Sequence, residues 1–346
     1  MSKTLQDYAT LINDTIQSNE INHYITTDNM RQNLGGIDTL KNINIPQGKV
    51  RSFQKDDVLL SNIRLYFRKV YKAKQKGGCS SDILVFRAKH IDSTTLFAIL
   101  SSQIFTDYAC LGSQGSKMPR GNKTHMMDFK IPTINFTIAK IFNSIQNKIE
   151  NNHKINELLH TLAYKIYGYY FKYKPKNAKL EQIIIENPKS SIMVKNAQKT
   201  QDKYPFFTSG DNILSYPKAI IDGRNCFLNT GGNAGIKFYV GKASYSTHTW
   251  CICANEFSDY LYLLLSSIKT HINQSFFQGT ILKRLQKNLL KEYPIYMPSA
   301  HEIKKFNQII MPLLTLISIN TRISKKLEQI RDFLLPLLLK QQVKPQ

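Results

Sequence analysis

The sequence predicts a mixed α/β protein in which one architectural unit occurs twice. Each unit is an α+β domain followed by a long helix, and the two helices pair as an antiparallel coiled coil with pseudo-twofold symmetry. Three observations predict this: segments of the two halves repeat each other, two helical seams share one irregularity, and both domain-sized segments mix strand-like and helix-like patterns. With 346 residues, the chain is long enough to bury two cores.

The repeat is clearest in the C-terminal part of each half. LFAILSSQIF, QGSKMPRGNK and AKIFNSI in the first half correspond to LYLLLSSIKT, QGTILKRLQK and IKKFNQI in the second. The offset is nearly constant, because Ser101 and Ser266 are 165 positions apart and Gly115 and Gly279 are 164 apart. A repeat of this length predicts two copies of one structural unit.

Strand and helix patterns alternate within both domains. Runs of strand length occur in DDVLLSNIRLYFRKVYKA, SDILVFRAK, AIIDGRNCFLN, IKFYVGKASYS and TWCICA, whereas TTLFAILSSQIFTDYA and SDYLYLLLSSIKTHIN are typical of short helices. The basic stretch FKYKPKNAK links the first long helix to the second domain. We therefore predict a first domain over 1–133, a first long helix over 134–172, a second domain over 173–298, and a second helix with a C-terminal tail over 299–346.

Both long helical segments carry apolar residues at alternating steps of three and four, which is the spacing of a coiled-coil seam. The first seam is Ile138, Phe142, Ile145, Ile149, Asn152, Ile155, Leu159 and Leu162, continued by Ile166 and Tyr169. The second seam begins at Phe306, continues through Ile310, Leu313, Ile317, Asn320, Ile323, Leu327, Ile330 and Leu334, and ends at Leu337. Each seam has an Asn at its fifth place, followed by an extra step of three. A lone Asn sets the register of a coiled coil, and the extra step overwinds it locally.

Two helices with the same irregularity most simply pack against each other. Each segment has about 40 residues, which corresponds to about 60 Å of helix. The alternative is that each helix packs separately on its own domain. Pro312 falls near the start of the second seam, where it should kink or delay the helix.

The composition indicates a polyanionic partner. The chain carries 47 basic and 24 acidic residues, a formal net charge of +23, and such a field attracts nucleic acid. No run of 18 apolar residues occurs, and MSKTLQDYAT lacks an apolar signal core, so we expect a cytoplasmic protein without a membrane partner. The five cysteines include no C-x-x-C pair, so reduced thiols are expected rather than a zinc site.

Several enzymatic motifs are incomplete. GKASYS lacks the upstream glycine that a Walker A phosphate loop requires, and NTGGNAG lacks the glycine spacing of a dinucleotide site. No Asn/Asp-Pro-Pro-aromatic loop is present to hold a flipped adenine, the histidines are scattered, and the acidic residues do not form a nuclease centre. We therefore predict no catalytic residue, no metal and no cofactor in this chain.

The candidate DNA-binding residues are mainly cations and amides in four short segments, two in each domain. Cations contact phosphates, while Arg and Lys suit guanine and Asn and Gln suit adenine. The candidates are Asn62, Arg64, Tyr66, Arg68, Lys117, Arg120, Asn122 and Lys123 in the first domain, and Asn229, Thr230, Asn233, Lys237, Lys283, Arg284, Gln286 and Lys287 in the second. For any one of them, a solvated surface position is the alternative.

These segments make the chain resemble the specificity subunits of type I restriction-modification systems. The resemblance rests on LLSNIRLYF, GGCSSDILVF and SKMPRGNK in the first domain and on IIDGRNCFLNTGGNAG, YVGKASYSTHTW and FFQGTILKRLQK in the second. The ending RDFLLPLLLKQQV is also typical of the family, so the resemblance covers both domains and both helices. Two departures are Asn122, where Asp is expected, and a second domain that is compact for the family.

The resemblance implies two target-recognition domains that read an asymmetric, bipartite site in double-stranded DNA, with the helices as a spacer. Two such domains on one rod should meet the duplex about 10 bp apart. It further implies docking of two methyltransferase subunits, which methylate adenine at N6 with S-adenosylmethionine, and a motor-nuclease subunit that can join them. This chain would then be non-catalytic. The alternatives are the specificity subunit of a methylation-only or other defence complex, a self-sufficient fused enzyme, and a non-specific nucleic-acid-binding or membrane-binding coiled-coil scaffold.

Overall fold

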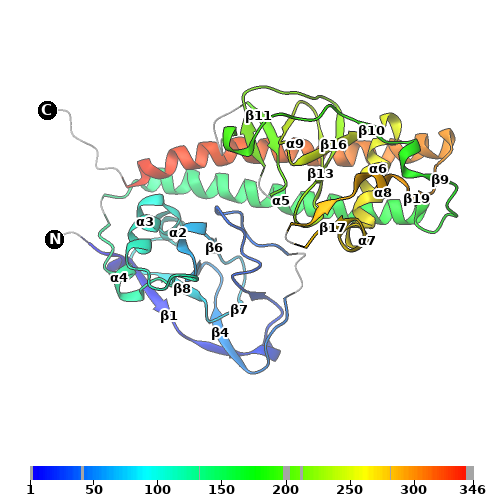
Figure 1. The fold of residues 1–346 in the computed structure, drawn as a ribbon. Helices are drawn as coiled ribbons and strands as arrows, with labels where there is room; N and C mark the ends of the chain where they lie inside the picture. Colours follow the sequence, from blue (N-terminus) through cyan, green and yellow to red (C-terminus); the bar gives the residue numbers. More distant parts are fainter. Residues whose placement is uncertain are drawn as a thin grey trace. The chain divides into compact units, whose positions relative to one another are not determined.

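The computed structural model describes residues 3–39, 43–131, 133–197, 203–210, 213–280 and 282–339 (Figure 1). The chain divides into two compact units, one formed by residues 1–154 and 324–346 and the other by residues 155–323. Two long helices, α5 (Phe136–Phe171) and α9 (Ala300–Leu338), contribute a segment to each unit. The part of the predicted C-terminal tail beyond residue 339 lies outside the described residues.

The first unit contains two four-stranded sheets. One has the order β1 (Ala9–Ile12), β8 (Ile83–Ala88), β5 (Val58–Ser61), β6 (Val70–Lys72) and is antiparallel throughout. The other has the order β2 (Thr15–Gln17), β4 (Lys49–Phe53), β7 (Gly77–Cys79), β3 (Tyr24–Ile25). Helices α1 (Leu5–Tyr8), α2 (Ser93–Ser101), α3 (Gln103–Leu111) and α4 (Lys123–Met127) complete the domain. Its main core joins buried residues of α2 to Phe142 of α5 and Leu335 of α9.

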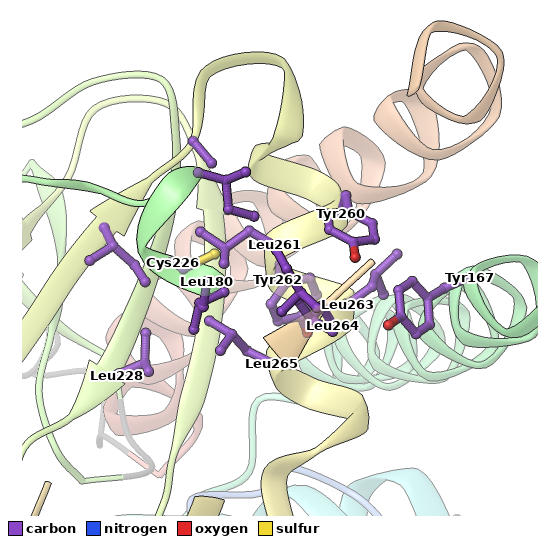
Figure 2. Close-up of a cluster of buried hydrophobic side chains, with 14 of the residues drawn as sticks. Tyr167, Leu180, Cys226, Leu228, Tyr260, Leu261, Tyr262, Leu263, Leu264 and Leu265 are labelled. Atoms are coloured by element: carbon purple, nitrogen blue, oxygen red, sulfur yellow. The ribbon is translucent and has the colours of Figure 1, made fainter. Parts of the chain in front are cut away.

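The second unit repeats the first sheet and its helices. Its four-stranded sheet has the order β10 (Ile185–Glu186), β16 (Thr249–Cys253), β13 (Arg224–Asn229), β14 (Ile236–Val240), followed by α6 (Ser258–Ser267), α7 (Lys269–Ser275) and α8 (Lys287–Lys291). A three-stranded sheet has the order β12 (Leu214–Tyr216), β11 (Tyr204–Phe207), β15 (Ser244–Tyr245). Strand β17 (Phe277–Gln278) pairs with β18 (Arg284–Leu285), and β19 (Pro294–Ile295) pairs with β9 (Ala178–Lys179). Figure 2 shows the core, in which Tyr260–Leu265 of α6 lie between Cys226 and Leu228 of β13 and Tyr167 of α5.

The two long helices run antiparallel within each unit. In the first unit, the Asn152 side chain donates to the Ser324 hydroxyl at 3.1 Å. In the second unit, the Asn320 side chain donates to the Asn156 carbonyl oxygen at 3.0 Å, and the Tyr170 ring packs on Phe306. The predicted mixed α/β class with two long antiparallel helices is therefore confirmed.

The predicted seam agrees with burial only in part. Phe142, Ile149, Asn152, Ile310, Ile317 and Asn320 are buried, and Ile138, Ile145, Leu159, Leu313, Leu327 and Leu334 are half-buried. The prediction is wrong for Ile155, Leu162, Ile323 and Ile330, whose side chains are exposed. Beyond Asn152, the buried face of α5 continues instead through Ala163, Tyr167 and Phe171. With 3.6 residues per turn, the face of α5 that stays buried includes an alanine and polar residues. A pattern based on large apolar side chains omits these positions.

The expectation that Pro312 delays the second helix is wrong. Helix α9 begins at Ala300 and continues without interruption through residue 312. Its first turn is capped by Ser299, whose hydroxyl accepts from the Glu302 N–H, while the Glu302 carboxylate accepts from the Ser299 N–H at 2.9 Å. This reciprocal cap accounts for a helix start well ahead of the proline.

Among the described residues, no helix is both long and apolar enough to cross a membrane.

Candidate nucleic-acid interface

In the first unit, two candidate segments that are far apart in the sequence form one surface. The Arg64 N–H donates to the Pro119 carbonyl oxygen at 2.9 Å, and the Gly121 N–H donates to the Asn62 carbonyl oxygen at 3.2 Å. The guanidinium of Arg64 also donates to the Lys117 carbonyl oxygen at 3.2 Å. These bonds join the loop 62–68 to the loop 114–123, so the two sets of candidates predicted in the first domain lie together. We call this joined pair the first loop surface.

The loop 114–123 is closed at its base by the backbone. Gln114 and Arg120 exchange two hydrogen bonds of 2.9 and 2.8 Å. Gly115 follows with φ of 101°, a conformation that side chains rarely adopt. The residues between Gln114 and Arg120 therefore project from the domain, and both Lys117 and Met118 are exposed.

The loop 62–68 contains two strained residues. Arg64 and Arg68 have φ of 50° and 49°, in the left-handed region, and they flank a 3₁₀ turn over Leu65–Phe67 (η2). A non-glycine residue in this region costs of order 1–2 kcal/mol. Leu65 is buried and anchors the turn, whereas Tyr66 is exposed. Such strain is typical of functional segments, and here it holds an aromatic ring on the first loop surface.

The second unit joins its two candidate segments in the same way. The Gly232 N–H donates to the Lys283 carbonyl oxygen at 2.9 Å, and the Leu285 N–H donates to the Thr230 carbonyl oxygen at 3.1 Å. Gly231 and Arg284 form an isolated antiparallel bridge. The loop 229–235 is thus fixed to the β17–β18 hairpin, and we call this pair the second loop surface.

The two loop surfaces correspond position by position. The corresponding residues, each 164 positions apart, are Gln114 and Gln278, Gly115 and Gly279, Met118 and Leu282, Arg120 and Arg284, and Lys123 and Lys287. Gly279 has a positive φ of 132°, as Gly115 does. The short helices that follow, α4 and α8, begin at Lys123 and Lys287. The repeat seen in the sequence is therefore a repeat of backbone geometry at the candidate interface.

Four candidates are buried or hydrogen-bonded within the protein, so their prediction as DNA contacts is corrected. Asn62 and Asn229 are buried; the Asn229 amide donates to the Ser209 and Asn233 carbonyl oxygens at 2.9 and 3.1 Å. The ammonium group of Lys237 donates to the carbonyl oxygens of Thr208 and Gly210. The Arg68 guanidinium donates to the Ser101 carbonyl oxygen at 2.9 Å, and burial lowers its pKa. The sequence does not distinguish these roles, because the same residue types serve as internal donors and as base-reading groups.

Lys287 belongs to a local charge cluster. Its ammonium group lies 4.9 Å from the centre of the Trp250 ring and 3.9 Å from Glu186. Burial lowers the pKa of Lys287, and Glu186 opposes this effect. Burial opposes ionisation of Glu186 too, but hydrogen bonds from Lys291 and from the Trp250 indole, the latter at 2.7 Å, lower its pKa overall. Lys287 therefore has partners within the protein, Glu186 and Trp250.

The remaining candidates are accessible to a ligand. Tyr66, Lys117, Arg120, Asn122, Lys123, Asn233, Lys283 and Arg284 are exposed, and Arg64, Thr230 and Gln286 are half-exposed. The side chains of Arg120 and Asn122 have polar partners within the protein. The Arg120 guanidinium forms an ion pair of 2.7 Å with Asp82, and the Asn122 side chain accepts from the His125 N–H at 3.1 Å as the cap of α4. The accessible set is basic on both loop surfaces, which suits a polyanion.

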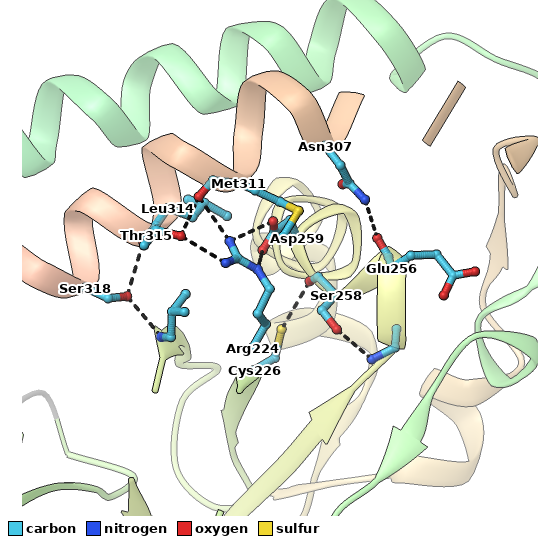
Figure 3. A network of polar contacts seen from close by, with 12 residues as sticks. Arg224, Cys226, Glu256, Ser258, Asp259, Asn307, Met311, Leu314, Thr315 and Ser318 are labelled. Carbon is cyan, nitrogen blue, oxygen red and sulfur yellow. Dashed lines mark hydrogen bonds and ion pairs between the residues drawn. The ribbon is translucent and has the colours of Figure 1, made fainter. Parts of the chain in front are cut away.

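The second domain is fixed to α9 by a polar network that the sequence analysis missed (Figure 3). Arg224 donates from Nε to a carboxylate oxygen of Asp259 at 2.8 Å and from Nη1 to the Thr315 hydroxyl at 2.9 Å. Burial raises the pKa of Asp259, and its bonds with Arg224 counteract this. The Val240 N–H also donates to the Ser318 hydroxyl at 3.0 Å. The sequence gives no signal for this network, because a single Arg at the start of a strand is common.

A different network performs this task in the first unit. Arg331 of α9 is almost fully buried, and its Nη1 donates to the Gln146 side-chain oxygen at 3.1 Å. The Gln146 amide nitrogen in turn donates to the Leu34 carbonyl oxygen of the domain. Asp332 accepts from Arg331 Nε at 3.0 Å. Both long helices and the first domain thus meet at one buried amide.

Comparisons with known proteins agree with this architecture. Residues 176–329 match the family model described as the type I restriction modification DNA specificity domain. No curated protein matches the chain. The fold is similar to that of the type I restriction-modification system S subunit from M. genitalium, with a TM-score of 0.64 at 14% identity over 99% of this chain and 96% of that one. The HsdS subunit from Thermoanaerobacter tengcongensis matches at 13% identity over 98% and 96% of the two chains, with a TM-score of 0.37.

Proposed function

We propose that this chain, a DNA specificity subunit of the type I restriction-modification family, recognises an asymmetric bipartite target in double-stranded DNA. Each loop surface reads one half of the target. Through this reading, the chain directs a partner adenine-N6 methyltransferase to the site. The observation that carries the proposal is that, in each unit, a basic loop is joined to a second candidate loop by backbone hydrogen bonds of the same kind.

The two halves of the target should differ. Both loop surfaces have the same backbone plan and an Arg at the same place, but Pro119 and Asn122 in the first correspond to Lys283 and Gln286 in the second. Phosphate contacts position the protein, whereas side chains at base edges select the sequence. Two surfaces with the same frame and different side chains therefore select different bases. The target is accordingly not palindromic.

The chain acts without its own catalytic group in this proposal. Two methyltransferase subunits supply the reaction and bind S-adenosylmethionine, and a motor-nuclease subunit can join the complex in the cytoplasm. An exposed apolar face of α5 supports the docking of a protein partner. Ile155, Leu158 and Leu162 are exposed on it, and their spacing of three and four places them on one side of the helix. Contiguous exposed apolar side chains are typical of protein interfaces.

The test is a genome-wide map of N6-methyladenine in cells that carry the partner methyltransferase, with and without this gene. We expect one split, asymmetric motif to disappear with the gene. Replacing residues 1–133 with the first domain of another specificity subunit should then change one half of the motif and leave the other half intact. The proposal fails if no adenine mark depends on the gene, or if the exchange alters both halves.

Substitution of the loop cations provides a second measurement. Lys117→Ala and Lys283→Ala each remove one exposed cation from a different loop surface. Each variant should weaken DNA binding by the assembled complex and reduce the slope of log K against log salt by about 1. Lys140→Ala, at an exposed position of α5, is the matched control and should leave the slope unchanged.

A further inference from the structure

Met118 and Leu282 are exposed apolar residues at equivalent places in the two loop surfaces. The two residues are 52% and 57% exposed. Each lies three residues after the glycine with positive φ and two residues before the repeated Arg. An isolated exposed apolar side chain is common and needs no explanation. Its recurrence at one position of a repeated loop, where most neighbours are polar or basic, does need one.

The backbone is built to hold these two residues outward. A Cβ on Gly279 would lie 2.5 Å from the carbonyl oxygen of Leu282, and the nearest atom to a Cβ on Gly115 is the carbonyl oxygen of Met118, at 3.6 Å. The same glycine thus faces the same carbonyl group in both turns. Behind each turn, hydrogen bonds between Gln114 and Arg120, and the pairing of Gln278 with Arg284, close the base. Each apolar residue therefore lies in a turn whose two ends are joined by backbone pairing.

This geometry fits the major groove of a duplex. The groove admits a two-stranded ribbon, and cations beside the apolar residue, such as Lys117 and Lys283, can reach phosphates. The apolar group that base pairs present in the major groove is the C5-methyl group of thymine. A half-site that contains a methylated adenine also contains the thymine opposite to it, so both halves of the proposed target hold this group.

We propose that Met118 and Leu282 are specificity-determining residues, each of which contacts a thymine methyl group in the major groove of its own half-site. This inference rests on the proposed function, because it assumes that each loop surface reads one half. It goes further by naming the base and the atom group that the two residues select. Met118 acts in the half read by the first unit, and Leu282 acts in the half read by the second.

The experiment replaces each thymine of the target, one at a time, with deoxyuridine, which lacks only the methyl group. Binding of the duplexes to the complex of this chain with its methyltransferase is measured by competition fluorescence anisotropy. We expect one thymine in each half at which the replacement weakens wild-type binding about three- to tenfold, the range for loss of one buried methyl contact. Met118→Ala should weaken binding similarly and remove the response to deoxyuridine in the first half only. Leu282→Ala should do the same in the second half only.

Conservative and distant variants complete the design. Met118→Leu and Leu282→Met should keep affinity and the deoxyuridine response, because they preserve an apolar side chain of similar length. Met193→Ala, at an equally exposed apolar position of the second domain outside the loop surface, should change neither. Each Ala variant also serves as the control for the other half of the target.

Three results would overturn the inference. The first is a half-site in which no deoxyuridine replacement affects wild-type binding, and the second is an Ala variant that still responds to the replacement. The third is an Ala variant that no longer assembles with the methyltransferase, which would indicate a contact between protein subunits, or one that loses affinity for all duplexes equally. An equal loss would indicate a DNA contact that does not depend on the thymine methyl group. A scrambled duplex tests the proposed function separately. If it binds as well as the target, the proposed function fails, and the inference fails with it.

Discussion

The two units attach their recognition domains to the long helices with different chemistry. In the second unit, Arg224 forms an ion pair with buried Asp259 and also donates a hydrogen bond to the Thr315 hydroxyl of α9. In the first unit, the contact is a neutral amide, Gln146, between buried Arg331 and the domain backbone. The same arrangement of helices and sheet thus tolerates either a charged or an amide anchor. Geometry repeats between the halves, whereas the polar groups that stabilise it do not.

The largest effect is expected from breaking the ion pair of the second unit. Asp259→Ala leaves the guanidinium of Arg224 largely buried without its carboxylate, so we expect a loss of about 3–5 kcal/mol in the free energy of unfolding. Urea denaturation of the full chain measures it. Glu292→Ala, which breaks an exposed ion pair with Lys179 in the same unit, is the control and should cost less than about 1 kcal/mol. Equal losses in the two variants would contradict the assignment of Asp259 as an anchor.

The second prediction separates the true seam from the predicted one. Ile149→Ala removes a fully buried side chain from α5 and should cost about 2–5 kcal/mol, since it leaves a cavity. Leu162→Ala, which the apolar pattern also places in the seam, should change stability by less than about 0.5 kcal/mol because this side chain is exposed. Thermal unfolding of the full chain distinguishes them. A large loss of stability for Leu162→Ala would show that Leu162 packs in the seam, as the apolar pattern predicts.

The third prediction concerns the amide anchor of the first unit. Arg331→Met removes a buried charge but leaves the Gln146 oxygen without its donor, so we expect a loss of about 1–3 kcal/mol. Gln146→Leu should cost more, because it leaves the Arg331 charge buried with fewer partners. Chemical denaturation of both variants gives the order. If Arg331→Met proves the more damaging change, the amide is not the centre of this anchor.

The smallest effect is expected at the helix starts. The Ser299 N–H and the Tyr296 hydroxyl donate to the Glu302 carboxylate and lower its pKa from 4.5 to about 2. Because the folded pKa lies below the unfolded value, this cap stabilises α9 fully above about pH 4.5 and is lost as the pH falls toward 2. Glu302→Gln should cost about 1 kcal/mol near neutral pH and remove this part of the acid sensitivity.

The start of α5 provides the matched comparison. Asn135 caps it with a neutral oxygen that accepts from the Ile138 N–H at 3.2 Å. Asn135→Ala should therefore cost a similar amount of stability, but the loss should not depend on pH between 2 and about 5. Denaturation curves at several pH values test both caps. An Asn135→Ala effect that follows the Glu302 titration would show that the two caps are not independent.

The fold class and the long helices could be predicted from the sequence because their signals are distributed over many residues. The match of residues 176–329 to the specificity-domain model agrees with the predicted specificity subunit over that part of the chain. Helix α5 spans Phe136–Phe171, close to the predicted range, because apolar residues at alternating steps of three and four recur over its whole length.

The sequence by itself determined the repeat, the basic character of the loops and the antiparallel helix pair, since composition, offset and period are local or additive properties. Only the tertiary structure decided which loops meet, through backbone bonds such as Gly121 to Asn62 and Gly232 to Lys283. It also decided that Asn229 and Lys237 serve the interior, and that the buried face of α5 passes through Ala163 rather than Leu162. The physical reason is that burial and hydrogen-bond partners depend on residues distant in the chain, which no local pattern records.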